Sequence, residues 1–366
     1  MFNKRISKQM KKTAITCVMA TALTVTSVCT DGFGAVVHEI AKVEAETITT
    51  EDGFVIQDRW IGNATERVLV EYTGEGGDIV IPDEVTVIRG YVFQDNDKIT
   101  SVTMGETVKE IGNRAFDRCE KLTTIKLASS IEKIGEYAFC DCKSLDMVSI
   151  PEGVKEIPNY AFYGCEKLTT IKLASSIEKI GENAFRECKS LDMVSIPEGV
   201  KEIQKEAFRN CEGMTSIKLA NSIEKIGDSA FRECKSLKTV NIPKSLTEIE
   251  DFIFEGCTSL VSVDMLQAEH LEKIGTSSFE NCENLTDIDL SKSKHLKEIV
   301  GYTFERCESL TNVVMPETVE TIGGAAFKQC EKLEYVKLPK NLKYLGFEAF
   351  RQCSELKNIE FPENFA

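Results

Sequence analysis

The sequence has few of the residues on which enzyme chemistry most often depends. Only three histidines occur among 366 residues, and His38 lies in the N-terminal leader described below. No G-x-S-x-G, H-E-x-x-H or phosphate-loop pattern is found. His270 and His295 recur at one position of a repeat, and two histidines alone do not complete a zinc site. The sequence therefore predicts no enzyme activity, no cofactor and no metal site.

The chain also lacks an excess of positive charge. It carries 44 Lys/Arg against 59 Asp/Glu, which gives a net charge of −15. Residues 1–45 hold six Lys/Arg and three Asp/Glu, so the rest of the chain has a net charge of −18. A surface of this sign repels phosphate backbones and anionic lipids. Nucleic acid is therefore not expected as a partner.

After the N-terminal leader, no apolar run is long enough to cross a membrane, so no transmembrane segment is expected in the mature chain. The leader begins with "MFNKRISKQMKK", which has five positive charges and no acidic residue. Residues 13–30 are uncharged and mostly apolar or small, and a small-x-small pattern ends at Ala45. This order is typical of a secretory signal peptide. We predict cleavage after residue 45 and a secreted or cell-surface protein.

Cysteine, by contrast, is abundant, and most of it is periodic. Eleven of the fourteen cysteines recur every 23 residues, with two steps of 25, and each has a Phe three residues before it. These periodic cysteines are Cys119, Cys142, Cys165, Cys188, Cys211, Cys234, Cys257, Cys282, Cys307, Cys330 and Cys353. An earlier turn has Asn96 at this position and brings the total to twelve turns. Self-similarity at such a period indicates a solenoid.

Each turn combines a strand pattern with a short helical pattern. In "TIKL", Ile125 and Leu127 point inward while Thr124 and Lys126 point outward, as in a strand. The "GEYAF" segment and its equivalents predict a single helical turn that begins at the glycine. One such turn buries too little apolar surface to be stable alone, so stacked neighbours must supply the core. With strands ~4.8 Å apart, twelve turns predict a rod or arc roughly 55 Å long.

The stretch "LTTIKLASSIEKIGEYAFCDCKSLDMVSIP" resembles the BspA-like leucine-rich repeat, and the resemblance extends over residues 82–366. It implies a leucine-rich repeat solenoid with a parallel β-sheet on its concave face and short extended segments and single helical turns on the other side. Residues 46–81 are similar to the N-terminal cap of such arrays, and we expect a β-hairpin, a Gly-rich turn and a first strand there.

The periodic cysteines are predicted to be buried free thiols. Asn96 at the same position suggests a short side chain with a donor for backbone carbonyls inside the turn. Disulfides between neighbouring turns are the main alternative, although parallel side chains in a ladder keep their Cβ atoms farther apart than the usual ~3.8 Å. Zinc is a weaker alternative, because single thiols on successive turns lack tetrahedral geometry.

Cys140 does not belong to this ladder. Its counterparts in neighbouring turns are polar or wettable, among them Asp117, Tyr163 and Arg186. We therefore predict an exposed thiol at Cys140. It serves either for linkage to another molecule or for no purpose.

An internal duplication points to candidate binding residues. Residues 119–164 and 165–210 differ at only eight of 46 positions, and all the differences lie in the "GEYAF" turns and their exits. Tyr137, Tyr160 and Tyr163 lie there, and exposed tyrosines suit partner binding. The alternative is that their rings cover the apolar edge of each turn while the hydroxyl groups stay in water.

The outward positions of the strands form a second candidate surface. Lys126, Lys172 and Lys218 make its early part basic, whereas Asp264 and Asp289 make its later part acidic. A long exposed sheet can serve as a binding platform. Solvation of a mixed-charge surface is the alternative, and the aspartates support a calcium site only weakly because no EF-hand loop is found.

The resemblance implies protein–protein interaction, in the form of adhesion to host proteins or to other cells. Extracellular or host proteins are then the expected partners. The alternative is a structural spacer whose solenoid presents no dedicated ligand site. The sequence leaves the oligomeric state open.

Overall fold

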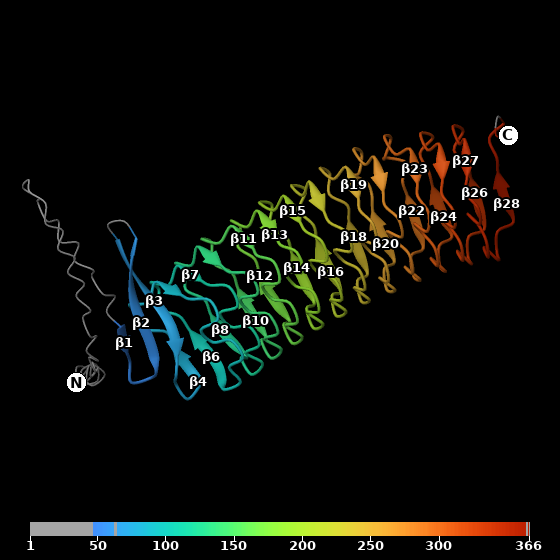
Figure 1. Cartoon of the computed structure of the whole chain (residues 1–366). Coiled ribbons are helices and arrows are strands. Elements are labelled where there is room, and N and C mark those ends of the chain that lie inside the picture. The colour runs from blue at the N-terminus through green and yellow to red at the C-terminus, as the bar shows by residue number, and fades with distance from the viewer. Residues whose placement is uncertain (1–46, 62–63, 364, 366) are drawn as a thin grey trace, which may run out of the picture.

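The computed structural model describes residues 47–61, 64–363 and 365, and the predicted signal peptide at 1–45 lies outside this range. The described residues form 28 strands and no helix. The chain coils around one long axis, and its turns stack into an elongated rod with the N-terminal cap at one end (Figure 1). The solenoid expected from the repeat is therefore confirmed.

One parallel sheet runs along the rod in three hydrogen-bonded segments of five, six and two strands, and it contains the strands predicted from the "TIKL" pattern. Its strands are β4 (Gly77–Val80), β6 (Ile99–Thr103), β8 (Thr124–Lys126), β10 (Met147–Ser149), β12 (Thr170–Lys172), β14 (Met193–Ser195), β16 (Ser216–Lys218), β18 (Thr239–Asn241), β20 (Ser262–Asp264), β22 (Asp287–Asp289), β24 (Asn312–Val314), β26 (Tyr335–Lys337) and β28 (Asn358–Glu360). Each strand lies beside the equivalent strand of the next turn. We call the outward side of this sheet the strand face.

A second parallel ladder of two-residue strands forms another side of the coil. It consists of β5 (Val87–Ile88), β7 (Glu110–Ile111), β9 (Lys133–Ile134), β11 (Glu156–Ile157), β13 (Lys179–Ile180), β15 (Glu202–Ile203), β17 (Lys225–Ile226), β19 (Glu248–Ile249), β21 (Lys273–Ile274), β23 (Glu298–Ile299), β25 (Thr321–Ile322) and β27 (Tyr344–Leu345). Within the hydrogen-bonded parts of this ladder, isoleucine pairs with isoleucine of the next turn, as Ile157 does with Ile180, except that Ile322 pairs with Leu345 in the last turn. The inward isoleucines therefore form a continuous buried row.

The N-terminal cap extends both sheets. It is a meander of β1 (Thr47–Thr49), β2 (Phe54–Ile61) and β3 (Ala64–Tyr72), which pair antiparallel in this order. β3 then pairs in parallel with β5, and β4 pairs in parallel with β6. The predicted hairpin and first strand are thus confirmed. Because β4 adds a strand ahead of the twelve predicted turns, the first sheet has thirteen strands.

The predicted single helical turns are wrong. We call the segments that carry them, such as residues 135–142, the turn side. In that segment Tyr137 and Asp141 have φ angles of 57° and 52°, which lie in the left-handed region. These two residues turn alternate N–H groups toward the next coil: Tyr137 N–H donates to Asn159 O (3.1 Å) and Phe139 N–H to Ala161 O (2.8 Å). An α-helix would need these same N–H groups for its i→i−4 hydrogen bonds. Because they donate to the next turn instead, no helix forms here.

A ladder of phenylalanines fills the core beneath the turn side. From Phe93 to Phe350, one ring per turn stacks on the next with centroids 4.8 to 5.5 Å apart. Phe54 and Tyr72 of the cap continue the row to Phe93. Full burial of one such ring contributes about 1.5–3 kcal/mol, so this row is a main source of stability.

Candidate interaction surfaces

The ladder cysteines are structural, as predicted. All eleven are free, and ten are buried, with Cys353 of the last turn half-buried. Each Sγ donates a hydrogen bond to the carbonyl of the ladder Phe one turn earlier, at 3.0 to 3.3 Å. Burial raises the pKa of these thiols, for example to about 12 at Cys119 and Cys234. They are therefore poor nucleophiles at neutral pH.

Asn96 at the head of this ladder acts differently from the prediction. Its Oδ1 accepts hydrogen bonds from Lys98 N–H (2.9 Å) and Ile99 N–H (3.0 Å) and does not take the place of a thiol donor. Asn96 lies in the first turn, so no earlier ladder Phe offers it a carbonyl. Asn96 and the ladder cysteines thus share a short polar side chain, but Asn96 accepts hydrogen bonds whereas the thiols donate them.

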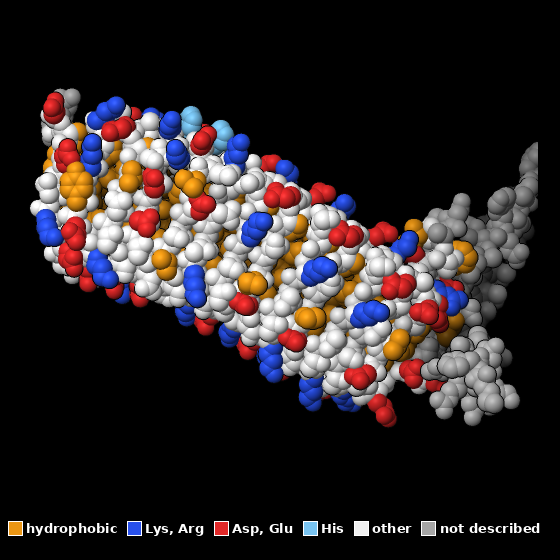
Figure 2. All heavy atoms as spheres, turned by 180° about the vertical axis from the view of Figure 1, so that it is seen from behind, with side chains coloured by type: hydrophobic (Ala, Val, Ile, Leu, Met, Phe, Trp, Pro, Cys, Tyr) orange, Lys and Arg blue, Asp and Glu red, His pale blue; other side chains and the backbone are white. Residues whose placement is uncertain are grey.

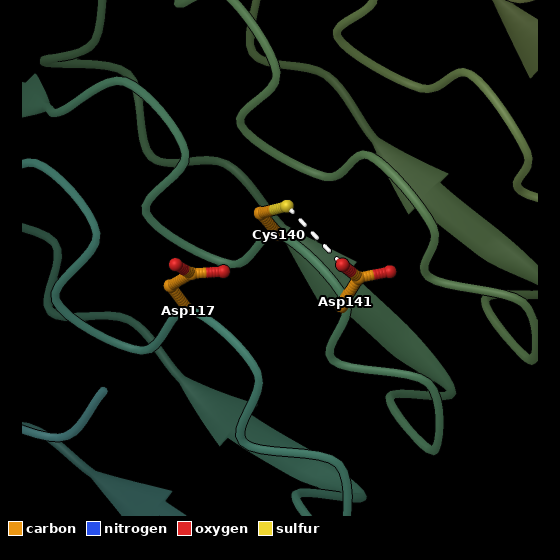
Figure 3. Close-up of side chains that lie close together, drawn as sticks. All are labelled: Asp117, Cys140 and Asp141. Atoms are coloured by element: carbon orange, nitrogen blue, oxygen red, sulfur yellow. Dashed lines mark hydrogen bonds between the residues drawn. The ribbon is translucent and has the colours of Figure 1, made fainter. Parts of the chain in front are cut away.

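The prediction of an exposed thiol at Cys140 is wrong. Its side chain lies next to Asp117 and Asp141 (Figure 3), and only 6% of the residue is exposed. The thiol donates to Asp141 Oδ2 at 3.7 Å. Burial and then the nearby carboxylates raise the pKa of Cys140 far above its usual range. Polar counterparts in other turns are buried at this position too, among them Asp117 and Glu305, so a polar column did not indicate exposure.

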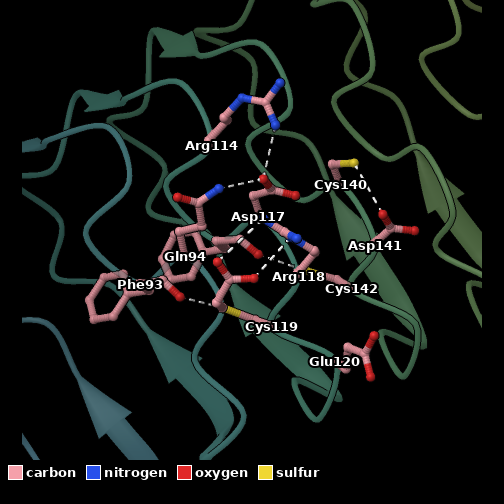
Figure 4. Close-up of polar contacts among 12 residues, drawn as sticks. Phe93, Gln94, Arg114, Asp117, Arg118, Cys119, Glu120, Cys140, Asp141 and Cys142 are labelled. Atoms are coloured by element: carbon pink, nitrogen blue, oxygen red, sulfur yellow. Dashed lines mark hydrogen bonds and ion pairs between the residues drawn. The ribbon is translucent and has the colours of Figure 1, made fainter.

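Asp117, Cys140 and Asp141 place three possible ligand atoms within 4.8 Å of one another. The Asp117 carboxylate is already occupied, because Oδ2 accepts from Arg114 Nη1 (3.0 Å) and Gln94 Nε2 (2.9 Å), as Figure 4 shows. The Cys140 thiol is protonated and bonded to Asp141. All three side chains thus already take part in hydrogen bonds with protein groups.

The three predicted tyrosines lie together on the turn side. Tyr137 and Tyr160 stack with centroids 4.5 Å apart and planes 5° from parallel, and Tyr163 packs at a tilt against Tyr160 at 5.9 Å. The guanidinium of Arg114 covers Tyr137 at 4.0 Å, and that of Arg186 approaches Tyr163 at 5.9 Å. All three tyrosines are half-buried, and desolvation raises the pKa of Tyr160 and Tyr163. This packing fits the alternative in which the rings cover the turn edge.

The charged columns next to the turn side are paired between turns. After each early ladder cysteine, Glu and Lys alternate, and Lys143 Nζ lies 2.6 Å from Glu120 Oε1. The same alternation recurs at the start of the second ladder, where Lys109, Lys155 and Lys201 lie 3.2 to 3.9 Å from Glu132, Glu178 and Glu224. In these columns the two-turn period of the duplication places opposite charges side by side.

The lysines of the strand face are not paired with acidic residues in this way. Lys126 in β8, Lys172 in β12 and Lys218 in β16 are exposed, and the residues between them are Ser149 and Ser195. Within the described chain, none of the three Nζ atoms has a carboxylate oxygen within 4.0 Å. At longer range, Lys126 contributes the smallest of the effects that lower the pKa of Glu106, whose main cause is hydrogen bonding from Ser129. The lysines thus remain available to an external partner.

Two exposed methionines accompany these lysines, and the sequence prediction missed them. Met147 of β10 is 57% exposed and Met193 of β14 is 64% exposed. They alternate with the lysine-bearing strands, because Met147 is opposite Thr124 and Ser149 is opposite Lys172. Figure 2 shows hydrophobic, basic and acidic side chains spaced among one another along one broad face of the rod. The signal in the sequence was the strict 46-residue repeat of an apolar residue at an outward strand position.

Asp264 and Asp289 lie on the same face, in β20 and β22, and both are exposed. Asp264 Oδ1 accepts from Leu266 N–H at 3.0 Å, and Asp289 Oδ1 accepts from Ser291 N–H at 2.9 Å. The hydrogen bonds from Ser291 lower the pKa of Asp289. These aspartates therefore hold the bend that follows each strand, and Lys218, the nearest of the three lysines, lies two strands before Asp264.

No helix in the described part of the chain is long and apolar enough to cross a membrane.

Comparisons with known proteins agree with this architecture. A family model described as BspA type leucine rich repeat region, in six copies, matches residues 71–192, 178–299 and 272–366. A leucine-rich repeat protein from Bacteroides ovatus ATCC 8483 has 29% sequence identity and a TM-score of 0.67, over 85% of this chain and 88% of its own. A leucine rich cell surface protein from Faecalibacterium prausnitzii A2-165 has 28% identity and a TM-score of 0.54, over 86% and 94%. No curated protein matches the sequence.

Proposed function

Because this chain belongs to the BspA-type leucine-rich repeat family, we propose that it is a secreted or cell-surface protein that binds other proteins through its strand face. Extracellular or host proteins are the partners, and adhesion to host or other cells is the outcome. The predicted signal peptide supports export, and the Faecalibacterium prausnitzii relative is described as a cell surface protein.

The observation that carries the proposal is the contrast between two lysine series with the same 46-residue step. Lys109, Lys155 and Lys201 each lie beside a glutamate one turn away. Lys126, Lys172 and Lys218 alternate with serine and have no such neighbour. Unlike the paired Lys109 series, this column keeps three cations and two exposed methionines free for contact. Exposed methionine adapts readily to different partner surfaces.

The half-buried tyrosines are the second candidate surface. Tyr137, Tyr160 and Tyr163 offer ring edges and hydroxyl groups to solvent, but they are already packed on one another and on arginines. We assign them a supporting role in the turn side. Asp264 and Asp289 are assigned to strand ends in the same way, since both carboxylates already accept backbone hydrogen bonds.

The test is a binding panel of purified extracellular-matrix and plasma proteins against the immobilised chain. A variant with Lys126→Glu, Lys172→Glu and Lys218→Glu is compared with one with Lys109→Glu, Lys155→Glu and Lys201→Glu. Both variants change the net charge by the same amount and at the same spacing. Saturable binding that the first variant loses and the second keeps supports the proposal. Binding that neither variant affects would place the contact outside the strand face, and no binding by the unmodified chain would favour the spacer alternative.

A further inference from the structure

The duplication makes the strand face repeat itself. The outward residues Thr124, Lys126, Met147 and Ser149 of β8 and β10 return unchanged as Thr170, Lys172, Met193 and Ser195 of β12 and β14. A third lysine, Lys218, follows in β16. We call Lys126, Met147, Lys172, Met193 and Lys218 the lysine–methionine surface. Adjacent copies of one small site favour a partner that repeats with the same step.

The step of this surface follows from the strand register. Lys126 and Lys172 are two strands apart, with Ser149 directly opposite Lys172 on the strand between them. Two strand spacings amount to ~9.6 Å, so the lysines recur at this distance along the rod axis. Met147 and Met193 recur with the same step in a parallel row. The two rows are separated by two residues along a strand, which is ~6.7 Å.

The following inference rests on the proposed function. We propose that the lysine–methionine surface binds an extended peptide in the polyproline II conformation, with an acidic side chain at every third residue. The peptide lies along the rod axis between the two rows. Its acidic side chains pair with Lys126, Lys172 and Lys218, and an apolar side chain of each triplet packs on Met147 or Met193.

The pitch of the peptide distinguishes this occupant from others. A polyproline II helix has three residues per turn and a rise of ~3.1 Å per residue, so equivalent side chains recur every ~9.3 Å. An α-helix brings a residue back to the same face after seven positions, or ~10.5 Å. An extended strand does so every ~6.7 Å. The polyproline II repeat is closest to the ~9.6 Å step, and its mismatch over three lysines stays below ~1 Å.

The symmetry of the peptide also fits the surface. Three residues per turn produce three columns of side chains, of which one can face the lysine row, one the methionine row and one the solvent. Each inner strand lies between two neighbouring strands, so the surface has no free sheet edge to which a peptide could add as a further strand. A polyproline II segment has no internal hydrogen bonds and keeps its backbone solvated, so it does not need such pairing. It is also largely ordered before it binds, which reduces the entropic cost.

The experiment measures binding of fluorescent peptides to the full chain by anisotropy at low and physiological salt. The probe is a capped peptide with six Pro-Pro-Glu triplets. The spacing control contains six Pro-Pro-Pro-Glu units, in which successive glutamates point in different directions around the same kind of helix. A third peptide has six Pro-Pro-Lys triplets. A fourth is α-helical with one glutamate in every seven residues.

We expect the Pro-Pro-Glu peptide to bind at least about tenfold more tightly than the spacing control, since three exposed ion pairs form together. Binding should weaken with salt. The variant with Lys126→Glu, Lys172→Glu and Lys218→Glu should lose it, whereas Lys109→Glu, Lys155→Glu and Lys201→Glu should change it less than about twofold. Met147→Thr with Met193→Thr copies the natural Thr124 and Thr170 and should weaken binding about three- to tenfold, from lost apolar contact alone.

Equal binding of the Pro-Pro-Glu peptide and its spacing control would overturn the proposal, because only net charge would then matter. Tighter binding of the helical peptide would also overturn it and would assign the surface to an α-helix. If a panel protein binds through the three lysines but none of the peptides does, the proposed function stands and this inference fails. If neither the panel nor the peptides depend on the lysines, both fail.

Discussion

The turn side and the strand face are built from the same repeat, yet they use it in opposite ways. On the turn side, the N–H groups of Tyr137 and Phe139, the stacked phenylalanines and the thiols all form contacts with the neighbouring turns. On the strand face, the strands lie side by side, but no hydrogen bond or ion pair joins the outward side chains of β8 to β16, all of which are described. If the strand face is the binding surface, as proposed, stability and recognition depend on different sides of the molecule. Substitutions should therefore affect one property without the other.

Alkaline pH should produce the largest effect, because it acts on the whole thiol ladder at once. Burial raises the pKa of Cys119 and Cys234 to about 12 and that of Cys353 to about 11, from an ordinary value of 9.0. The unfolded chain therefore ionises first, so the stability contributed by the thiols is complete below pH 9 and is lost as pH rises through 11 and 12. For each thiol that is protonated in the folded chain but ionised in the unfolded chain, the free energy of unfolding falls by about 1.4 kcal/mol per pH unit in that window.

Thermal unfolding measured between pH 7 and 11.5 in the presence of reductant checks this expectation. The Cys211→Ala variant serves as a control, since it should be less stable at pH 7 but should have a shallower loss above pH 9. A constant melting temperature across this range would contradict the protonated thiol ladder.

A single substitution in the phenylalanine ladder should have the next largest effect. Phe208 is fully buried and stacks between Phe185 and Phe231 with centroids 5.2 and 5.5 Å away. Phe208→Ala leaves a cavity with turns on both sides and should reduce the free energy of unfolding by about 3–5 kcal/mol. Lys172→Ala on the strand face should change it by less than about 0.5 kcal/mol. Urea denaturation followed by circular dichroism measures both, and similar losses in the two variants would remove the distinction between the sides.

Substitution of Tyr137, which stacks on Tyr160, should have a stability effect of intermediate size. Tyr137→Asn copies Asn183, the residue at the duplicated position, and Asn tolerates the left-handed backbone there. The variant loses the stack on Tyr160 and the contact with Arg114, so we expect a loss of about 1–2 kcal/mol in stability. Binding to any partner of the strand face should be unchanged. A loss of binding at unchanged stability would move the contact surface to the turn side.

The smallest expected effect concerns single lysines. Lys201 lies 3.2 Å from Glu224 in an exposed pair, so Lys201→Ala should cost about 0.2–0.5 kcal/mol and less at high salt. Lys218→Ala should cost nothing measurable, because Lys218 has no such pair among the described residues. Denaturation at two salt concentrations resolves the difference if replicates are averaged. A salt-dependent loss for Lys218→Ala would mean that the strand-face lysines are structural.

Much of the fold could be predicted from the spacing of a few residue types. The positions of Phe, Cys and Leu within the 23-residue period placed the buried rows correctly, because a stacked coil must repeat its inward residues at each turn. The single helical turns could not be predicted, since "GEYAF" satisfies a helical pattern locally. Its alternate N–H groups find acceptors on the next turn, and a neighbouring turn is invisible in a local pattern.

The candidate site was predictable only in part for a similar reason. Lys126, Lys172 and Lys218 followed from the alternation of outward strand positions. Their lack of an acidic neighbour depended on the register between turns. Cys140 was misplaced because polar counterparts suggested an exposed position, whereas Asp117 in the same column is itself buried.

The sequence by itself determined the coil, its period and the residues that face inward, because buried apolar periodicity leaves no other arrangement in which each turn covers the next. It also determined where the two copies of the duplicated unit remain identical. Only the tertiary structure decided which charges neutralise one another and which thiols are covered, and that Tyr137 packs on Tyr160. These properties depend on distances between turns, and such distances are set when the turns stack.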